Sequence, residues 1–130
     1  MLENERNFKN MSDDDRIIID LKMERLMKKI IFFVPVGSAD KVKQALFSTG
    51  AGRIGNYENC SFETLGTGQF RPVGSASPTI GKIDKLEKVE ELKVEMICED
   101  NIIESALTAL RSAHPYEEPA VDVLELLNFD

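Results

Sequence analysis

Apolar and polar residues follow two periodicities along this chain after residue 26. The uninterrupted apolar run from Ile30 to Val34 predicts a central strand over Lys29–Val36, buried on both faces. Apolar residues alternate with charged ones over Val89–Glu99, which is typical of a strand with one buried face. Two further strands are predicted over residues 57–65 and 120–127. The second and third strands then form a hairpin with a long connection.

Two segments carry apolar residues at helical spacing. The first, residues 39–49, follows Ser38 as a candidate cap and is ended by glycines. The second starts near Asn101, with Glu104 three residues later as in a capping box. This helix should end at His114, because the following proline disfavours helical geometry for the residue before it.

The order strand, helix, strand, strand, helix, strand predicts an α+β fold, the ferredoxin-like βαββαβ sandwich. With right-handed crossovers it builds a four-stranded antiparallel sheet with two helices on one face. No helix is left to cover the other face, and Phe32 and Phe62 are expected to contribute to it. We therefore expect the protein to form a homo-oligomer through that face.

Composition narrows the class of protein. The 130 residues are 42% hydrophobic and 30% charged, which suits one globular domain. The net charge of −7 and the lack of a basic patch argue against binding to nucleic acid. No apolar run approaches the length that spans a bilayer, and the N-terminus has no apolar signal core, so we expect no membrane association and a cytoplasmic location.

Residues 1–26 differ from the rest because they are rich in charge and poor in apolar side chains. We interpret them as a charged N-terminal extension and residues 27–130 as the folded domain. Disorder is expected up to Ser12, and Ser12 with Asp15 is a weak signal for the start of a short helix that runs to about residue 26.

The two cysteines, Cys60 and Cys98, belong to no Cys-x-x-Cys pair, so they indicate neither a zinc site nor a redox motif. If the hairpin is centred near residue 79, the two would face one another across the second and third strands. We expect reduced, packed thiols, with a redox switch as the alternative.

The segment Ala113–Pro119, the proline-bracketed corner, holds the only histidine of the chain. An unperturbed histidine titrates near neutral pH, and Glu117 and Glu118 are close enough to His114 to tune it. The corner can therefore bind a divalent metal ion or report pH, and three copies of His114 around a threefold axis would make a trigonal site. The alternative is a stiff connection between helix and strand.

Two glycine-bearing segments are further candidates. Gly50, Gly52 and Arg53 can hold an anion through backbone N–H groups and a guanidinium, or simply form a turn. The second segment runs from Gly66 to Pro72, and it can contact a ligand or partner, or serve as a flexible hairpin connection. The chain supplies no activated nucleophile and no cofactor cradle, so we predict no catalytic residue.

Four segments, taken together and in order, resemble the insert domain of the NGG-interacting factor three-like family, YqfO branch. The segments are Thr49–Tyr57, Cys60–Phe62, Gly66–Pro72 and Ala113–Pro119. The resemblance covers about three-quarters of the chain and implies a fold like that of the PII and CutA proteins, for which trimers are usual. It also implies that residues 66–72 fall where PII proteins carry a long regulatory loop. The family's two-metal site needs several histidines from a separate, larger domain, and this chain has one.

We therefore expect a stand-alone, non-enzymatic regulatory or sensing module that binds a small ligand or a divalent metal ion in clefts between subunits, with a trimer favoured over a dimer. The expected ligand-binding residues are Gly50, Gly52, Arg53, Gly66, Gly68, Phe70, Arg71, His114, Tyr116, Glu117 and Glu118, with His114 as the candidate metal ligand. The alternative is a protein-interaction or structural module without a ligand, docking through residues 1–26. A metal-dependent hydrolase related to the full-length family is the less favoured possibility.

Overall fold

The computed structural model describes residues 12–16 and 27–127. From residue 27 onward the order is strand, helix, strand, strand, helix, strand, as predicted. The elements are β1 (Met27–Pro35), α3 (Ala39–Phe47), β2 (Phe62–Phe70), β3 (Glu87–Glu99), α4 (Ile103–Ala113) and β4 (Val121–Leu126), with short 3-10 turns at Val36–Ser38 and Asp100–Ile102.

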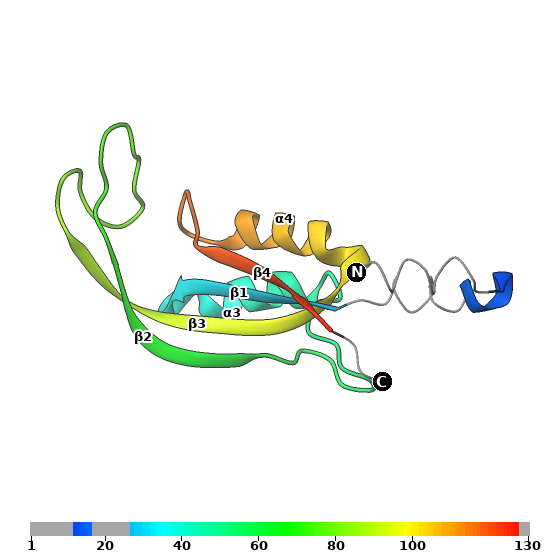
Figure 1. The fold of residues 1–130 in the computed structure, drawn as a ribbon. Helices are drawn as coiled ribbons and strands as arrows, with labels where there is room; N and C mark the ends of the chain where they lie inside the picture. The colour runs from blue at the N-terminus through cyan, green and yellow to red at the C-terminus, as the bar shows by residue number, and fades with distance from the viewer. Residues whose placement is uncertain (1–11, 17–26, 128–130) are drawn as a thin grey trace.

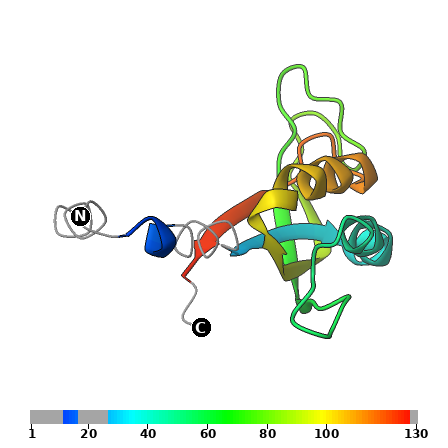
Figure 2. The ribbon, with the colours of Figure 1, turned by 90° about the vertical axis from the view of Figure 1, so that its right-hand side faces the viewer.

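The four strands form one antiparallel sheet in the order β2-β3-β1-β4. Helices α3 and α4 pack side by side on one face of this sheet (Figures 1 and 2). This arrangement confirms the predicted α+β sandwich. Within residues 12–16 and 27–127, no helix lies on the other side of the sheet, called the open face below.

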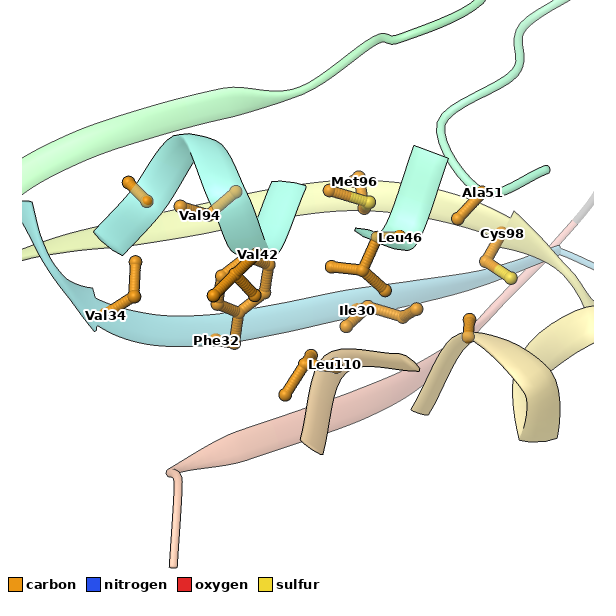
Figure 3. Packing of buried hydrophobic residues seen from close by; sticks show 12 residues of the cluster. Ile30, Phe32, Val34, Val42, Leu46, Ala51, Val94, Met96, Cys98 and Leu110 are labelled. Atoms are coloured by element: carbon orange, nitrogen blue, oxygen red, sulfur yellow. The ribbon is translucent and has the colours of Figure 1, made fainter. Parts of the chain in front are cut away.

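The core lies between the sheet and the two helices (Figure 3). Alternate residues of β1 point into it, and Phe32 is fully buried opposite Val94 of β3. Phe32 therefore faces the helices, and its assignment to the uncovered face is wrong. Phe62 does lie on the open face and is 67% exposed. Ile31 on the same face is only 9% exposed, so the centre of β1 is buried on both sides.

The second strand differs from the prediction. Strand β2 spans Phe62–Phe70 instead of residues 57–65, so most of the glycine-bearing segment pairs with β3 and is not a loop. Backbone pairing needs no side chain, and neither Gly66 nor Gly68 has a positive φ that would break the strand. The hairpin connection is therefore residues 71–86. The expected regulatory loop at 66–72 is corrected accordingly.

The helix ends agree only in part with the capping signals. Ser38 occupies the N-cap position of α3, but its side chain makes no capping hydrogen bond. The predicted capping box at Asn101 is wrong, because residues Asp100–Ile102 form a 3-10 turn that starts the helix by a different route. The predicted end is confirmed: α4 stops at Ala113 and His114 is extended, with ψ of 137°.

Only a short part of the N-terminal extension belongs to the described residues. Residues 13–16 are helical, and the Asp15 N–H donates to Ser12 Oγ at 3.1 Å, which agrees with the predicted helix start. The rest of the predicted helix and the predicted disorder lie outside the described residues. Within residues 12–16 and 27–127, no helix has the length and apolar character needed to cross a membrane.

Candidate functional site

A pocket of about 540 Å³ opens on one end of the sheet. It lies where the hairpin connection, residues 71–86, meets the proline-bracketed corner, and its sheet side is formed by residues of the open face. Its lining residues are Phe33, Gly68, Gln69, Phe70, Arg71, Pro72, Val73, Ala76, Pro78, Thr79, Ile80, Glu91, Tyr116, Glu117, Glu118 and Ala120. The pocket therefore brings together two segments that the sequence analysis had singled out separately.

His114 does not line this pocket, but its ring is hydrogen-bonded to two residues that do, Phe33 and Tyr116. Its Nε2 lies 2.7 Å from the Phe33 carbonyl oxygen, and its Nδ1 accepts a hydrogen bond from the Tyr116 N–H at 3.1 Å. The carbonyl can only accept, so Nε2 carries the proton and the ring is neutral. Burial lowers the pKa of His114, which reinforces the neutral form. Both ring nitrogens are thus engaged within the chain, and a metal ion at His114, which stays a prediction, would have to break one of these bonds.

Tyr116 joins the corner to the sheet. Its hydroxyl donates to Glu91 Oε2 at 2.9 Å, and its ring meets the ring of Phe70 edge to face at 5.7 Å. Burial and the neighbouring Glu91 raise the pKa of Tyr116, so the phenol remains a proton donor at neutral pH. These contacts fix one wall of the pocket.

Glu91 was missed by the sequence analysis, where it was simply one charged residue of an alternating strand. The structure leaves it only 8% exposed, on the open face of β3. Its carboxylate lies over Gly68, where a Cβ atom would overlap the carboxylate. A glycine in a strand often marks such a close approach, and that was the available signal.

The hairpin connection is anchored to the corner. The Ser77 N–H donates to Glu117 Oε1 at 2.9 Å, and the Thr79 hydroxyl donates to the Pro115 carbonyl oxygen at 2.6 Å. Arg71 pairs with Asp84 at 3.6 Å, both side chains being more than half exposed. These bonds hold the connection over the pocket.

The first glycine segment lies at the opposite end of the sheet. The Gly52 N–H donates to the Ile97 carbonyl oxygen at 2.7 Å, and the Gly50 N–H donates to the Phe47 carbonyl oxygen at 3.0 Å. Arg53 is 4.0 Å from a carboxylate oxygen of Glu58. The backbone donors expected for an anion therefore already have partners in the fold.

The predicted binding residues thus divide into four groups. Gly68, Phe70, Arg71, Tyr116, Glu117 and Glu118 line the pocket. His114 positions it, Gly66 lies outside it on β2, and the remaining three residues belong to the glycine segment at the other end. Phe33 and Glu91 also line the pocket and were not predicted. Both were hidden in strands whose burial pattern explained them without any ligand.

The cysteines do not face one another in the sheet. Pairing of Phe62 with Glu95 sets a register in which position 60 would lie opposite Ile97, and Cys60 precedes the strand. Both thiols are free, with Cys98 buried and Cys60 partly exposed. Burial raises the pKa of Cys98 to about 11, which makes its thiol a poor nucleophile.

Across residues 12–16 and 27–127, no group of three or more histidine, cysteine, aspartate or glutamate side chains is arranged to hold a metal ion. The described residues therefore do not fit the dinuclear centre that the resemblance assigns to full-length members. These residues supply no ligand set for metal-dependent hydrolysis at such a centre.

Comparison with known proteins gives relatives in sequence. No family model matches the chain. The proteins named GTP cyclohydrolase 1 type 2 homolog are similar to it, with 46% identity over 100 residues in Halalkalibacterium halodurans and 42% over 101 residues in Mycobacterium tuberculosis. Each match covers 77% to 78% of this chain but only 27% of the relative. The chain thus spans about a quarter of the length of the curated relatives that it matches.

Solved structures agree with this relationship. A Bacillus cereus protein related to NIF3 superposes with a TM-score of 0.68 at 42% identity, over 80% of this chain and 26% of that one. The divalent ion tolerance protein CutA1 from Ehrlichia chaffeensis superposes with a TM-score of 0.59 over 82% of this chain and 86% of that one, at 13% identity, and so shares the fold alone. Over about three-quarters of its length the chain is therefore related to the longer proteins of the NGG-interacting factor three-like family, with which it shares a PII/CutA-like domain.

Proposed function

We propose that this chain is a non-enzymatic regulatory or sensing module that binds a small molecule in the pocket between the hairpin connection and the proline-bracketed corner. The observation that carries the proposal is the pocket itself, which falls in the size range of small-molecule sites. Aromatic side chains and a few convergent polar groups line it, as is usual for such sites.

The residues best suited to acid–base catalysis already have structural roles. His114 uses both ring nitrogens within the chain, and Glu117 accepts a backbone hydrogen bond from the hairpin connection. A general base must be within reach of a substrate proton. His114 and Glu117 instead use these atoms in hydrogen bonds that connect the segments around the pocket. Binding is therefore favoured over the cyclohydrolase chemistry mentioned in the name of the longer relatives.

The proposal includes a homo-oligomer, with a trimer favoured over a dimer, in which sister subunits cover the open face and border the pocket. Phe62 and Leu124 lie on that face and are 67% and 49% exposed. Strand β2 is an edge of the sheet, so one row of its backbone groups is open to pairing. Both features favour contact with another copy of the chain.

Native mass spectrometry of the protein purified from cells tests both parts. We expect a trimer that carries a small-molecule adduct, released on denaturation and absent from a Tyr116→Ala variant. A Phe62→Glu variant should shift the mass distribution toward monomer. A monomer without any adduct, before and after incubation with a small-molecule cell extract, would contradict the proposal.

A further inference from the structure

We propose that the pocket selects an organic cation, a small amine with a flat apolar body, and that the carboxylate of Glu91 is its charge partner. This inference rests on the proposed function, because it names the ligand class of the same pocket. It also makes Glu91 a specificity-determining residue, in addition to its role as the acceptor of the Tyr116 hydroxyl.

Glu91 carries a charge that no cation pairs within the described residues. A carboxylate in a site that is 92% buried is normally paired with a cation. In the described part of the chain, Glu91 forms no ion pair, and its side chain accepts a single hydrogen bond, from the Tyr116 hydroxyl to Oε2. Oε1, which lies over Gly68, therefore keeps its acceptor capacity in a residue that lines the pocket.

Aromatic rings form part of the pocket lining. Phe33, Phe70 and Tyr116 all contribute to the pocket, and two of these rings already meet edge to face beside the carboxylate. Aromatic faces attract ammonium groups and cover flat apolar molecules. Rings around a buried carboxylate are suited to a ligand that is both cationic and apolar.

The charged residues that line the pocket are mostly acidic. Three glutamates line it, Glu91, Glu117 and Glu118, against the single arginine Arg71. The Arg71 guanidinium lies at the exposed rim and pairs with Asp84, whereas the carboxylate of Glu91 is buried. Inside the pocket an anionic ligand would lie against an unpaired buried carboxylate, so the charge distribution favours a cation.

Gly68 makes room for the Glu91 carboxylate. Its backbone does not have a positive φ, so nothing in its conformation demands glycine. The requirement is steric, because a Cβ atom there would displace the Glu91 carboxylate. Gly66 lies two residues earlier on the same face of the same strand, and a Cβ atom there would meet nothing within 4 Å. The two glycines therefore provide a matched pair of variants.

The experiment uses three indole probes that differ mainly in charge: tryptamine, tryptophol and indole-3-propionate. The protein contains no tryptophan, so the fluorescence of the indole can be followed with little protein background. We expect wild-type protein to bind tryptamine at least about tenfold more tightly than either other probe, which corresponds to about 1.4 kcal/mol.

Glu91→Gln keeps the shape of the side chain and removes its charge, and we expect it to abolish the preference for tryptamine. Gly68→Ala should weaken tryptamine binding about tenfold, whereas Gly66→Ala should bind like wild type, with thermal melts confirming that each variant is folded. Equal affinity for all three probes, no binding of any probe, or an unchanged preference in Glu91→Gln would overturn the inference. An adduct found by native mass spectrometry that is neutral or anionic would overturn it while leaving the proposed function standing.

Discussion

The two ends of the sheet use similar residues for different purposes. In the segment around Gly50 and Gly52, the backbone N–H groups of both glycines donate to carbonyl oxygens of the same fold. The end that contains Gly68 leaves a pocket of about 540 Å³ and a buried carboxylate with spare acceptor capacity. Glycine and charge are thus weak signals of a site. What distinguishes the ends is whether the fold itself satisfies the polar groups that it gathers.

The largest expected effect on stability comes from the end of the sheet that contains Gly52. Gly52 has φ of +78°, and a Cβ atom there would collide with the Cys60 carbonyl oxygen and the Phe47 ring. We expect Gly52→Ala to lower the free energy of unfolding by about 3 kcal/mol, measured by urea denaturation.

Gly55→Ala is the matched control for this variant. Gly55 also has a positive φ, of +55°, but a Cβ atom there would meet nothing within 4 Å, so the cost should be about 1 kcal/mol. Equal losses of unfolding free energy in the two variants would contradict the close packing around Gly52.

The histidine of the corner should give a smaller effect that depends on pH. At pH 8 we expect His114→Ala to lower the free energy of unfolding by about 2 kcal/mol. The substitution removes two hydrogen bonds and leaves the Phe33 carbonyl oxygen and the Tyr116 N–H without a partner. The lowered pKa of His114 means that the unfolded chain binds a proton before the native protein does. Wild-type stability from this group is thus complete above about pH 6.5 and declines as the pH falls below it.

Denaturant titrations of both proteins between pH 8 and pH 5 measure this dependence. The difference in unfolding free energy between wild type and His114→Ala should shrink as the pH falls. A difference that grows on acidification would show that His114 is stabilised as the cation, which would contradict its role as a neutral bridge.

Part of the fold and of the candidate site could be predicted from the sequence. Hydrophobic periodicity gave the order of elements, and the proline after His114 gave the end of α4, since both depend on local geometry. The bounds of β2 were not accessible, because Gly66 and Gly68 are weak strand formers and tertiary pairing with β3 overrides that preference. Glu91 was not found either, because its hydrogen-bond partner Tyr116 is distant in sequence and Gly68 was only an indirect sign of its position.

A modest effect is expected at the anchor of the hairpin connection. Glu117→Ala removes the acceptor of the Ser77 N–H and should cost about 1 kcal/mol or less, since the bond is exposed. Hydrogen exchange should accelerate across residues 71–86. Glu118→Ala, which alters a neighbouring carboxylate without a hydrogen bond to the connection, should leave exchange there unchanged; equal acceleration in both variants would contradict the anchoring role.

The smallest effect on stability concerns the thiols. Cys98 is buried, with its pKa raised to about 11, whereas Cys60 is partly exposed. We expect a thiol reagent at pH 7.5 to modify Cys60 in the folded protein and Cys98 only after unfolding, as mass spectrometry of digested protein would show. Rapid modification of Cys98 in the native state would mean that this end of the core opens readily.

The most direct test of the difference between the two ends is a ¹⁵N–¹H spectrum recorded during titration with tryptamine. The account predicts shifts of the amide signals of Gly68, Phe70 and Tyr116 that saturate together, with the signals of Gly50 and Gly52 unmoved. Saturable shifts centred on Gly50 and Gly52, with the pocket signals unchanged, would contradict it.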